Sequence, residues 1–158
     1  ESKEALVCEV LEDQAKRFWT WWDSVLQRHA GEPRAQIEAL FDELRECMSC
    51  SGTERGCPLT NAAVELVEDE HPARELIRRH KGDITKRLRD LCREMGARQP
   101  DVLGDSLALL MNGIFAARVG GDGAEQVSSV YDAAKALIES PALGVVAPKK
   151  KRPSRAAD

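Results

Sequence analysis

Apolar residues recur at intervals of three and four along most of the chain, the spacing that places side chains on one face of an α-helix. The pattern is clearest between Pro72 and Gly96. Proline favours the first position of a helix, and glycine commonly follows a helix end. This stretch therefore predicts one long helix around which the others pack, and its apolar stripe comprises Ala73, Ile77, His80, Ile84, Leu88, Leu91 and Met95.

The same spacing, bounded by proline and glycine, predicts five further helices. Their expected ranges are 2 to about 30, 33 to about 50, a short helix after 58, 100 to about 119, and 122 to about 139. No segment alternates between apolar and polar residues in the manner of a strand. The sequence therefore predicts an all-α, six-helix domain, in which the helix from 100 to 119 is apolar on several sides and should be widely buried.

Composition divides the chain into an acidic body and a basic end. With 158 residues and 42% hydrophobic content, residues 1–140 suffice for one domain with its own core. Residues 141–158 are rich in proline and lysine, so we expect a disordered, solvated tail. Because the basic residues gather there, the body is more acidic than the formal net charge of −4 suggests and should bind phosphate poorly.

The chain shows neither a signal peptide nor an apolar stretch long enough to span a bilayer. An odd number of cysteines, five, fits a reducing compartment better than a disulfide framework. These features predict a cytoplasmic protein without membrane contact.

Cys47, Cys50 and Cys57 form a CxxC-x6-C pattern that could serve a metal- or thiol-responsive switch. Structural zinc needs four ligands, so another would have to come from Cys8, His71 or His80. The favoured interpretation is that these cysteines are small buried apolar side chains, and no metal or cofactor is predicted.

Two observations argue against an enzyme. Glu68 and His71 have the Glu-x-x-His spacing of a di-iron bundle, but the second pair that such a site needs is missing. No nucleophile, base and orienting group occur together, and the sequence has no phosphate-binding loop. A helical-bundle enzyme therefore stays the least favoured alternative.

The opening segment SKEALV resembles the segment that follows the recognition helix in TetR-family transcriptional regulators. RGCPLTNAAVEL, then HPA, then LALLMNGIFAAR resemble the ligand-binding and dimerisation half of the same family, so the likeness covers most of residues 1–139. The resemblance implies a regulator, most simply a repressor, whose DNA binding responds to a small molecule. The helix-turn-helix is absent from this sequence, so DNA contact is expected only through a parent protein.

The resemblance also implies a pocket lined by the first, second, fourth and fifth helices, which binds an apolar or aromatic effector. Large apolar side chains would form its walls, and His80 and Asn112 would orient the ligand. The alternative is that the apolar residues are core and the polar pair is satisfied by neighbours. The candidate pocket residues are Trp19, Trp22, Phe41, Leu44, Met48, His80, Met111, Asn112 and Phe115.

The last two helices are expected to form a homodimer interface, as the resemblance implies. The helix from 100 to 119 has more apolar faces than its own chain is expected to cover, and large exposed apolar patches mark interaction sites. Two helices from each subunit would then form a four-helix bundle about a two-fold axis. The candidate interface residues are Leu109, Gly113, Ala116, Ala117, Val127, Val130, Tyr131, Ala134 and Ile138.

Overall fold

The computed structural model describes residues 2–49, 56–66, 70–117 and 124–145, without the side chains of 48, 49, 124–126 and 128. These residues form six helices and no strand, which confirms the predicted all-α fold. Within the described ranges, no helix is long and apolar enough to cross a membrane. The helices are α1 (Lys3–Arg28), α2 (Pro33–Ser49), α3 (Pro58–Glu65), α4 (Ala73–Glu94), α5 (Pro100–Ala117) and α6 (Ala124–Glu139).

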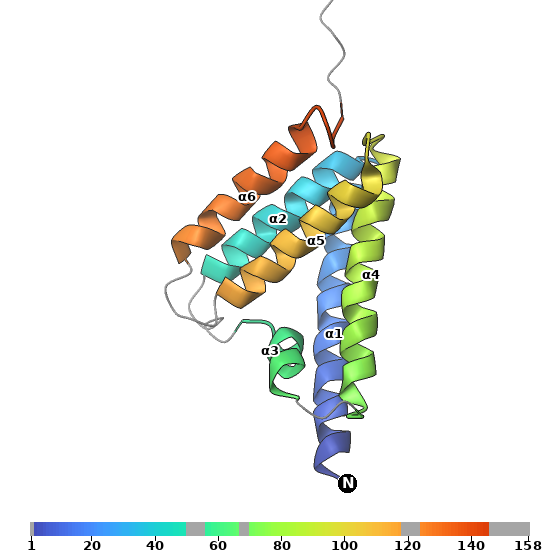
Figure 1. Cartoon of the computed structure of the whole chain (residues 1–158), viewed down its shortest axis with the longest axis vertical. Coiled ribbons are helices and arrows are strands. Elements are labelled where there is room, and N and C mark those ends of the chain that lie inside the picture. The colour runs from blue at the N-terminus through green and yellow to red at the C-terminus, as the bar shows by residue number, and fades with distance from the viewer. Residues whose placement is uncertain (1, 50–55, 67–69, 118–123, 146–158) are drawn as a thin grey trace, which may run out of the picture.

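The helices are arranged in two groups (Figure 1). α1 and α4 run side by side along the long axis of the molecule, and the short α3 packs beside the amino-terminal half of α1. α2, α5 and α6 form an inclined layer at the other end. The most extensive contacts join α4 to α5, α2 to α6 and α5 to α6. α4 therefore connects the two groups, as the long apolar stripe predicted.

Helix boundaries follow local sequence signals. Ser2 caps α1, where its Oγ accepts a hydrogen bond from the Ala5 amide at 3.1 Å. Proline is the first residue of α2, α3 and α5, where its missing N–H is not needed. Gly96 follows α4 with a φ of 75°, a conformation that glycine adopts without strain. The last helix is predicted from residue 122, which lies outside the described residues, and its described part begins at Ala124.

Two clusters of buried side chains form the interior. The larger draws on α1, α2, α4, α5 and α6 and includes Trp22, Phe41 and Met111. The smaller joins α1, α3 and α4 through Leu11, Leu59 and neighbouring side chains. The α4 stripe serves both, because its first members belong to the smaller cluster and its later members to the larger.

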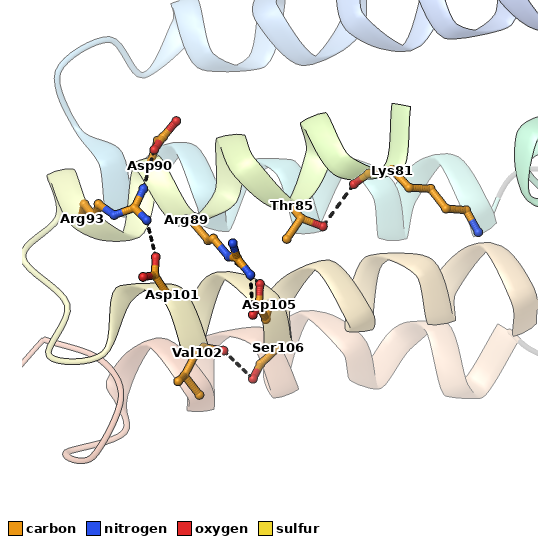
Figure 2. Close-up of polar contacts among 9 residues, drawn as sticks. All are labelled: Lys81, Thr85, Arg89, Asp90, Arg93, Asp101, Val102, Asp105 and Ser106. Atoms are coloured by element: carbon orange, nitrogen blue, oxygen red, sulfur yellow. Dashed lines mark hydrogen bonds and ion pairs between the residues drawn. The ribbon is translucent and has the colours of Figure 1, made fainter. Parts of the chain in front are cut away.

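α4 and α5 approach each other most closely at Gly104. A Cβ atom at this position would lie 2.6 Å from Cγ and 2.7 Å from Cα of Arg89. Arg89 crosses from α4 to Asp105 on α5 with a two-pronged ion pair of 2.7 and 2.8 Å, which lowers the pKa of Asp105 (Figure 2). Arg93 bridges Asp90 and Asp101 nearby. Backbone proximity and paired charges therefore fix this crossing together.

The packed unit extends past the predicted boundary at residue 140. The Gln99 amide donates to the Leu143 carbonyl at 3.2 Å, and the Arg98 amide donates to the Gly144 carbonyl at 3.3 Å. Leu143 also packs against the larger core. Residues 141–145 are therefore docked against the connection between α4 and α5, while 146–158 of the predicted tail lie outside the described residues.

Candidate functional site

An apolar cavity of about 280 Å³ opens between α1, α2, α5 and the start of α3. This volume is at the lower end of the range for small-molecule sites, which are mostly apolar with a few polar groups. The residues that line the cavity are Gln14, Arg17, Phe18, Trp21, Leu44, Cys47, Gly56, Cys57, Pro58, Leu59 and Phe115.

Local structure explains how these side chains meet. Gln14, Arg17, Phe18 and Trp21 recur at helical spacing, so α1 presents them on one face. The opposite side comes from the segment before α3, where Gly56 has a φ of 67° and Cys57 is the N-cap residue. The cavity thus depends on the turn into α3 as well as on helix packing.

Phe18 joins the cavity to a cluster of aromatic rings. Its ring centroid lies 4.9 Å from that of His80, 5.8 Å from Trp22 and 6.5 Å from Phe115. Trp19 completes the cluster, with its centroid 5.2 Å from His80 and 5.6 Å from Trp22. A side chain that lines the cavity is therefore in direct contact with the buried rings.

Two ring nitrogens in this cluster have no hydrogen-bond partner among the described residues. They are Nε1 of Trp22 and Nδ1 of His80. Trp22 is 0% exposed and His80 is 5% exposed. Burial lowers the pKa of His80, and Asp83 only partly opposes this effect. The imidazole is therefore held neutral inside the domain.

The lowered pKa of His80 makes the stability of the domain depend on pH. In the unfolded chain His80 titrates near 6.5. Because the folded state binds this proton less readily, stability is complete above that pH and falls as the pH drops towards the folded pKa. The slope is at most about 1.4 kcal/mol per pH unit. Urea unfolding at about pH 8 and about pH 5.5 should show a smaller acid loss in His80→Phe than in the unmodified chain.

In that comparison, the charges around His80 stay the same in both proteins. Lys81 and Asp83 lie beside it on α4, and Arg79 and Glu12 line the same hollow. An equal acid loss in the two proteins would contradict the assignment of the titration to His80.

A second cavity of about 290 Å³ lies on the other side of the ring cluster, between α1 and α4. Trp19 and His80 line it together with Ala15 and Leu76. Its remaining lining residues are charged, namely Glu12, Arg79 and Asp83. This hollow is therefore less suited to an apolar ligand than the first.

The residues that were predicted to line one pocket lie at different sites in the structure. Leu44 and Phe115 line the apolar cavity, whereas Trp19 and His80 line the hollow between α1 and α4. Trp22, Phe41 and Met111 are fully buried core residues. The side chain of Met48 lies outside the described residues. Contrary to the expected lining, no α4 residue borders the apolar cavity.

Asn112 satisfies itself locally. Its Nδ2 donates to the Ala108 carbonyl one turn earlier at 2.8 Å, and the residue is half-buried. One alternative from the sequence was that hydrogen-bond partners within the domain satisfy both polar side chains. The structure supports that alternative for Asn112, but Nδ1 of His80 has no such partner among the described residues.

The sequence pattern did not identify Phe18 and Trp21 as cavity residues. Phe18 shares the helical spacing of Leu11 and Val25, which predicts a core position, and Trp21 falls outside that spacing. In the structure Trp21 is half-buried, and its Nε1 donates to Glu43 Oε2 at 3.0 Å. These residues could have been found from the helical spacing of Gln14, Arg17, Phe18 and Trp21 in α1. Because two of the four are polar, the spacing did not stand out as an apolar face.

The cysteines that suggested a switch are not gathered as a metal site within the described residues. There, no group of three His, Cys, Asp or Glu side chains could hold a metal ion. Cys47 and Cys57 both line the apolar cavity, and Cys50 lies outside the described residues. His71 accepts a hydrogen bond from the amide of Ala73, the first residue of α4, at 3.1 Å. Burial raises the pKa of Cys92 to about 12, so that thiol is unreactive.

The predicted interface residues also fall into two groups. Leu109, Gly113 and Ala116 are exposed on α5, and Ala117, Val130 and Tyr131 are half-buried. Val127, Ala134 and Ile138 are instead at most 1% exposed in the larger core of the same chain. These last three positions hold α6 to its own domain and do not present a surface to a second copy.

A solved structure has a fold similar to that of this chain. A crystal structure at 2.10 Å resolution, described as a TetR transcriptional regulator from Streptomyces avermitilis, has a TM-score of 0.63 and 23% sequence identity to this chain. The match covers 85% of this chain and 75% of the other, and it shows a shared fold. A comparison with curated proteins gave no match.

A model of one protein family matches residues 33–137, which is more than half of the chain and includes most of α2 to α6. Its description is the tetracyclin repressor-like C-terminal domain. The chain therefore belongs to this family and is a domain of a transcriptional regulator.

Proposed function

We propose that this chain is the ligand-sensing and dimerisation domain of a TetR-like regulator, a repressor whose DNA binding responds to a small molecule. The observation that carries the proposal is the apolar cavity of about 280 Å³ in a regulator domain. Phe18, Trp21 and Phe115 give it aromatic walls. We assign the DNA contact to a helix-turn-helix outside this chain, and we propose no catalytic role.

A sensor must bind its effector with different affinity in two conformations, because a ligand shifts an equilibrium only by that difference. The cavity supports the proposal, since its lining residues come from several elements, namely α1, α2, α5 and the start of α3. A ligand that fills it must therefore move these elements relative to one another or hold them in one arrangement.

We also propose a homodimer formed through α5. Apolar or small residues follow its exposed side at intervals of three, four and seven, namely Val102, Leu109, Gly113 and Ala116. Leu109 is 73% exposed, which is unfavourable for a large side chain unless a second copy covers it. With Val130 and Tyr131 of α6 beside it, this row can form a two-fold four-helix bundle. The α5 row, rather than the buried stripe of α6, makes the interface.

A thiol-responsive switch is the second candidate function. The observation that favours it is that Cys47 and Cys57, from α2 and from the N-cap of α3, line the same cavity. A reactive ligand in the cavity would then meet both sulfur atoms.

The ligand proposal can be tested by blocking the cavity from its rim. Cys47 is exposed near the end of α2 and lines the cavity, so Cys47→Trp should cover the opening without disturbing the core. Isothermal titration calorimetry with naphthalene should detect binding to the unmodified chain and at least about tenfold weaker binding to Cys47→Trp, the loss expected when a buried aromatic contact is excluded.

Glu46→Trp is the matched control, because Glu46 is the exposed neighbour and does not line the cavity. It should bind naphthalene like the unmodified chain. If the unmodified chain does not bind naphthalene, the cavity is not the sensor site. The same conclusion follows if Cys47→Trp and Glu46→Trp weaken naphthalene binding equally.

A further inference from the structure

The ring cluster beside the cavity encloses two polar atoms that the described residues leave unpaired. Trp22 Nε1 and His80 Nδ1 belong to residues that are respectively 0% and 5% exposed. An unpaired buried polar group is costly, so native interiors seldom keep two in one cluster. The rings of Trp22 and His80 both contact Phe18 and Trp19, and their unpaired nitrogens indicate a polar group that arrives with a bound molecule.

Phe18 lines the apolar cavity and contacts both rings that carry these nitrogens. Its ring centroid lies 4.9 Å from that of His80 and 5.8 Å from that of Trp22. The Phe18 side chain is half-buried, so a change of its rotamer breaks fewer packing contacts than the same change at a fully buried ring. Displacement of the Phe18 ring would therefore open the cavity towards the rings of His80 and Trp22.

We infer that the effector of the proposed sensor is a hydroxylated aromatic molecule whose ring displaces Phe18 and whose hydroxyl group binds Trp22 Nε1 and His80 Nδ1. This inference rests on the proposed function. It names the chemical class of the ligand and the polar atoms that select it.

A hydroxyl group is the chemistry that the two nitrogens require together. The indole N–H of Trp22 only donates, so it needs an oxygen that accepts. A neutral imidazole nitrogen either donates or accepts a hydrogen bond, depending on the tautomer. A hydroxyl group can pair with either tautomer, because it both accepts and donates. A carboxylate would accept from Trp22 but would bring an uncompensated charge into a cluster of rings.

The charged hollow on the other side of His80 is a poorer route to the same atoms. Glu12, Arg79 and Asp83 line it, so water and ions would compete there for the ligand's hydroxyl group. The apolar cavity instead buries the aromatic part of the ligand while the hydroxyl group reaches inward.

Three probes that share one ring system test the inference by calorimetry on the unmodified chain. 2-Naphthol can donate and accept, 2-methoxynaphthalene can only accept, and naphthalene can do neither. We expect 2-naphthol to bind at least about tenfold more tightly than naphthalene, with 2-methoxynaphthalene between them.

His80→Phe keeps a ring of similar size and removes the nitrogen. It should reduce the preference for 2-naphthol over naphthalene by several-fold. His29→Phe is the matched control, because His29 lies at the C-cap of α1 and lines neither cavity. It should keep the full preference.

Nitrogen-15 NMR of the unmodified chain supplies a measurement that needs no variant to fold. 2-Naphthol should shift the imidazole resonances of His80 and the indole resonance of Trp22, and naphthalene should leave the imidazole nitrogens nearly unchanged. Equal affinity for 2-naphthol and naphthalene would overturn the inference while the proposed function stands. Absence of naphthalene binding would overturn both, and a 2-naphthol preference that survives in His80→Phe would overturn the assigned contact.

Discussion

Ala134→Glu should destabilise the domain severely and unfold part of the population, whereas Ala116→Glu should leave it folded and only dissociate the proposed dimer. Ala134 is 1% exposed in the larger core, where a glutamate has neither space nor a partner. Overpacking and an uncompensated buried carboxyl group together should cost about 3–5 kcal/mol. That is a large share of the roughly 5–15 kcal/mol that stabilises a typical domain.

Ala116 differs because it is exposed on α5 in the proposed interface. Its glutamate variant places two like charges in each two-fold seam, which disfavours association while the monomer keeps its core. Circular dichroism should show helix loss only for Ala134→Glu, and sedimentation equilibrium should show folded monomers for Ala116→Glu. Leu6→Glu, at an exposed position on α1, is the control and should remain a dimer. If the unmodified chain sediments as a monomer at high concentration, the interface is not the one proposed.

Gly104→Ala should lower the free energy of unfolding by about 2–3 kcal/mol, a typical cost of overpacking a tight contact. The added Cβ would lie 2.7 Å from both Cα and N of Arg89, and backbone atoms cannot move aside as a side-chain end can. α4 and α5 would have to separate, which strains the ion pair between Arg89 and Asp105. Urea unfolding monitored by circular dichroism measures the change.

Gly82→Ala is the matched control on α4. A Cβ there meets no atom within 4 Å, so only helix propensity changes. This variant should gain about 0.5–1 kcal/mol, as alanine does over glycine in an exposed helix interior. Equal stability of the two variants would mean that the close approach at Gly104 does not limit packing.

The sequence predicted the helices well because their ends carry signals that act locally. Prolines begin three of them, and Gly96 ends the central one. The stripe on α4 was predictable for the same reason, since a helical period fixes which side chains share a face. Ala73, Ile77 and Ile84 are all buried as this period requires.

Periodicity could not show which neighbour covers each face. Val127, Ala134 and Ile138 form an apolar stripe that would suit a second copy or the same chain, and the structure buries them in the larger core of their own domain. One side of the apolar cavity was also missed, because it is formed by the turn at Gly56 and Cys57. Whether a polar side chain in an apolar stripe forms a hydrogen bond depends on where its polar atoms point. The sequence does not show this, so Asn112 and His80 could not be told apart from the sequence.

The length of α1 determines how far its amino-terminal end moves when the helix tilts at Phe18. α1 is one unbroken helix of 26 residues, and in Figure 1 its amino-terminal end projects beyond the rest of the domain. Phe18 lies fifteen residues from Lys3, which is about 22 Å at the rise of an α-helix. A rigid α1 that tilts about Phe18 therefore moves its amino-terminal end further than it moves the cavity wall. A tilt of about 5° at Phe18 would carry Lys3 through about 2 Å, so a small movement beside the cavity would be enlarged at the amino-terminal end of the helix.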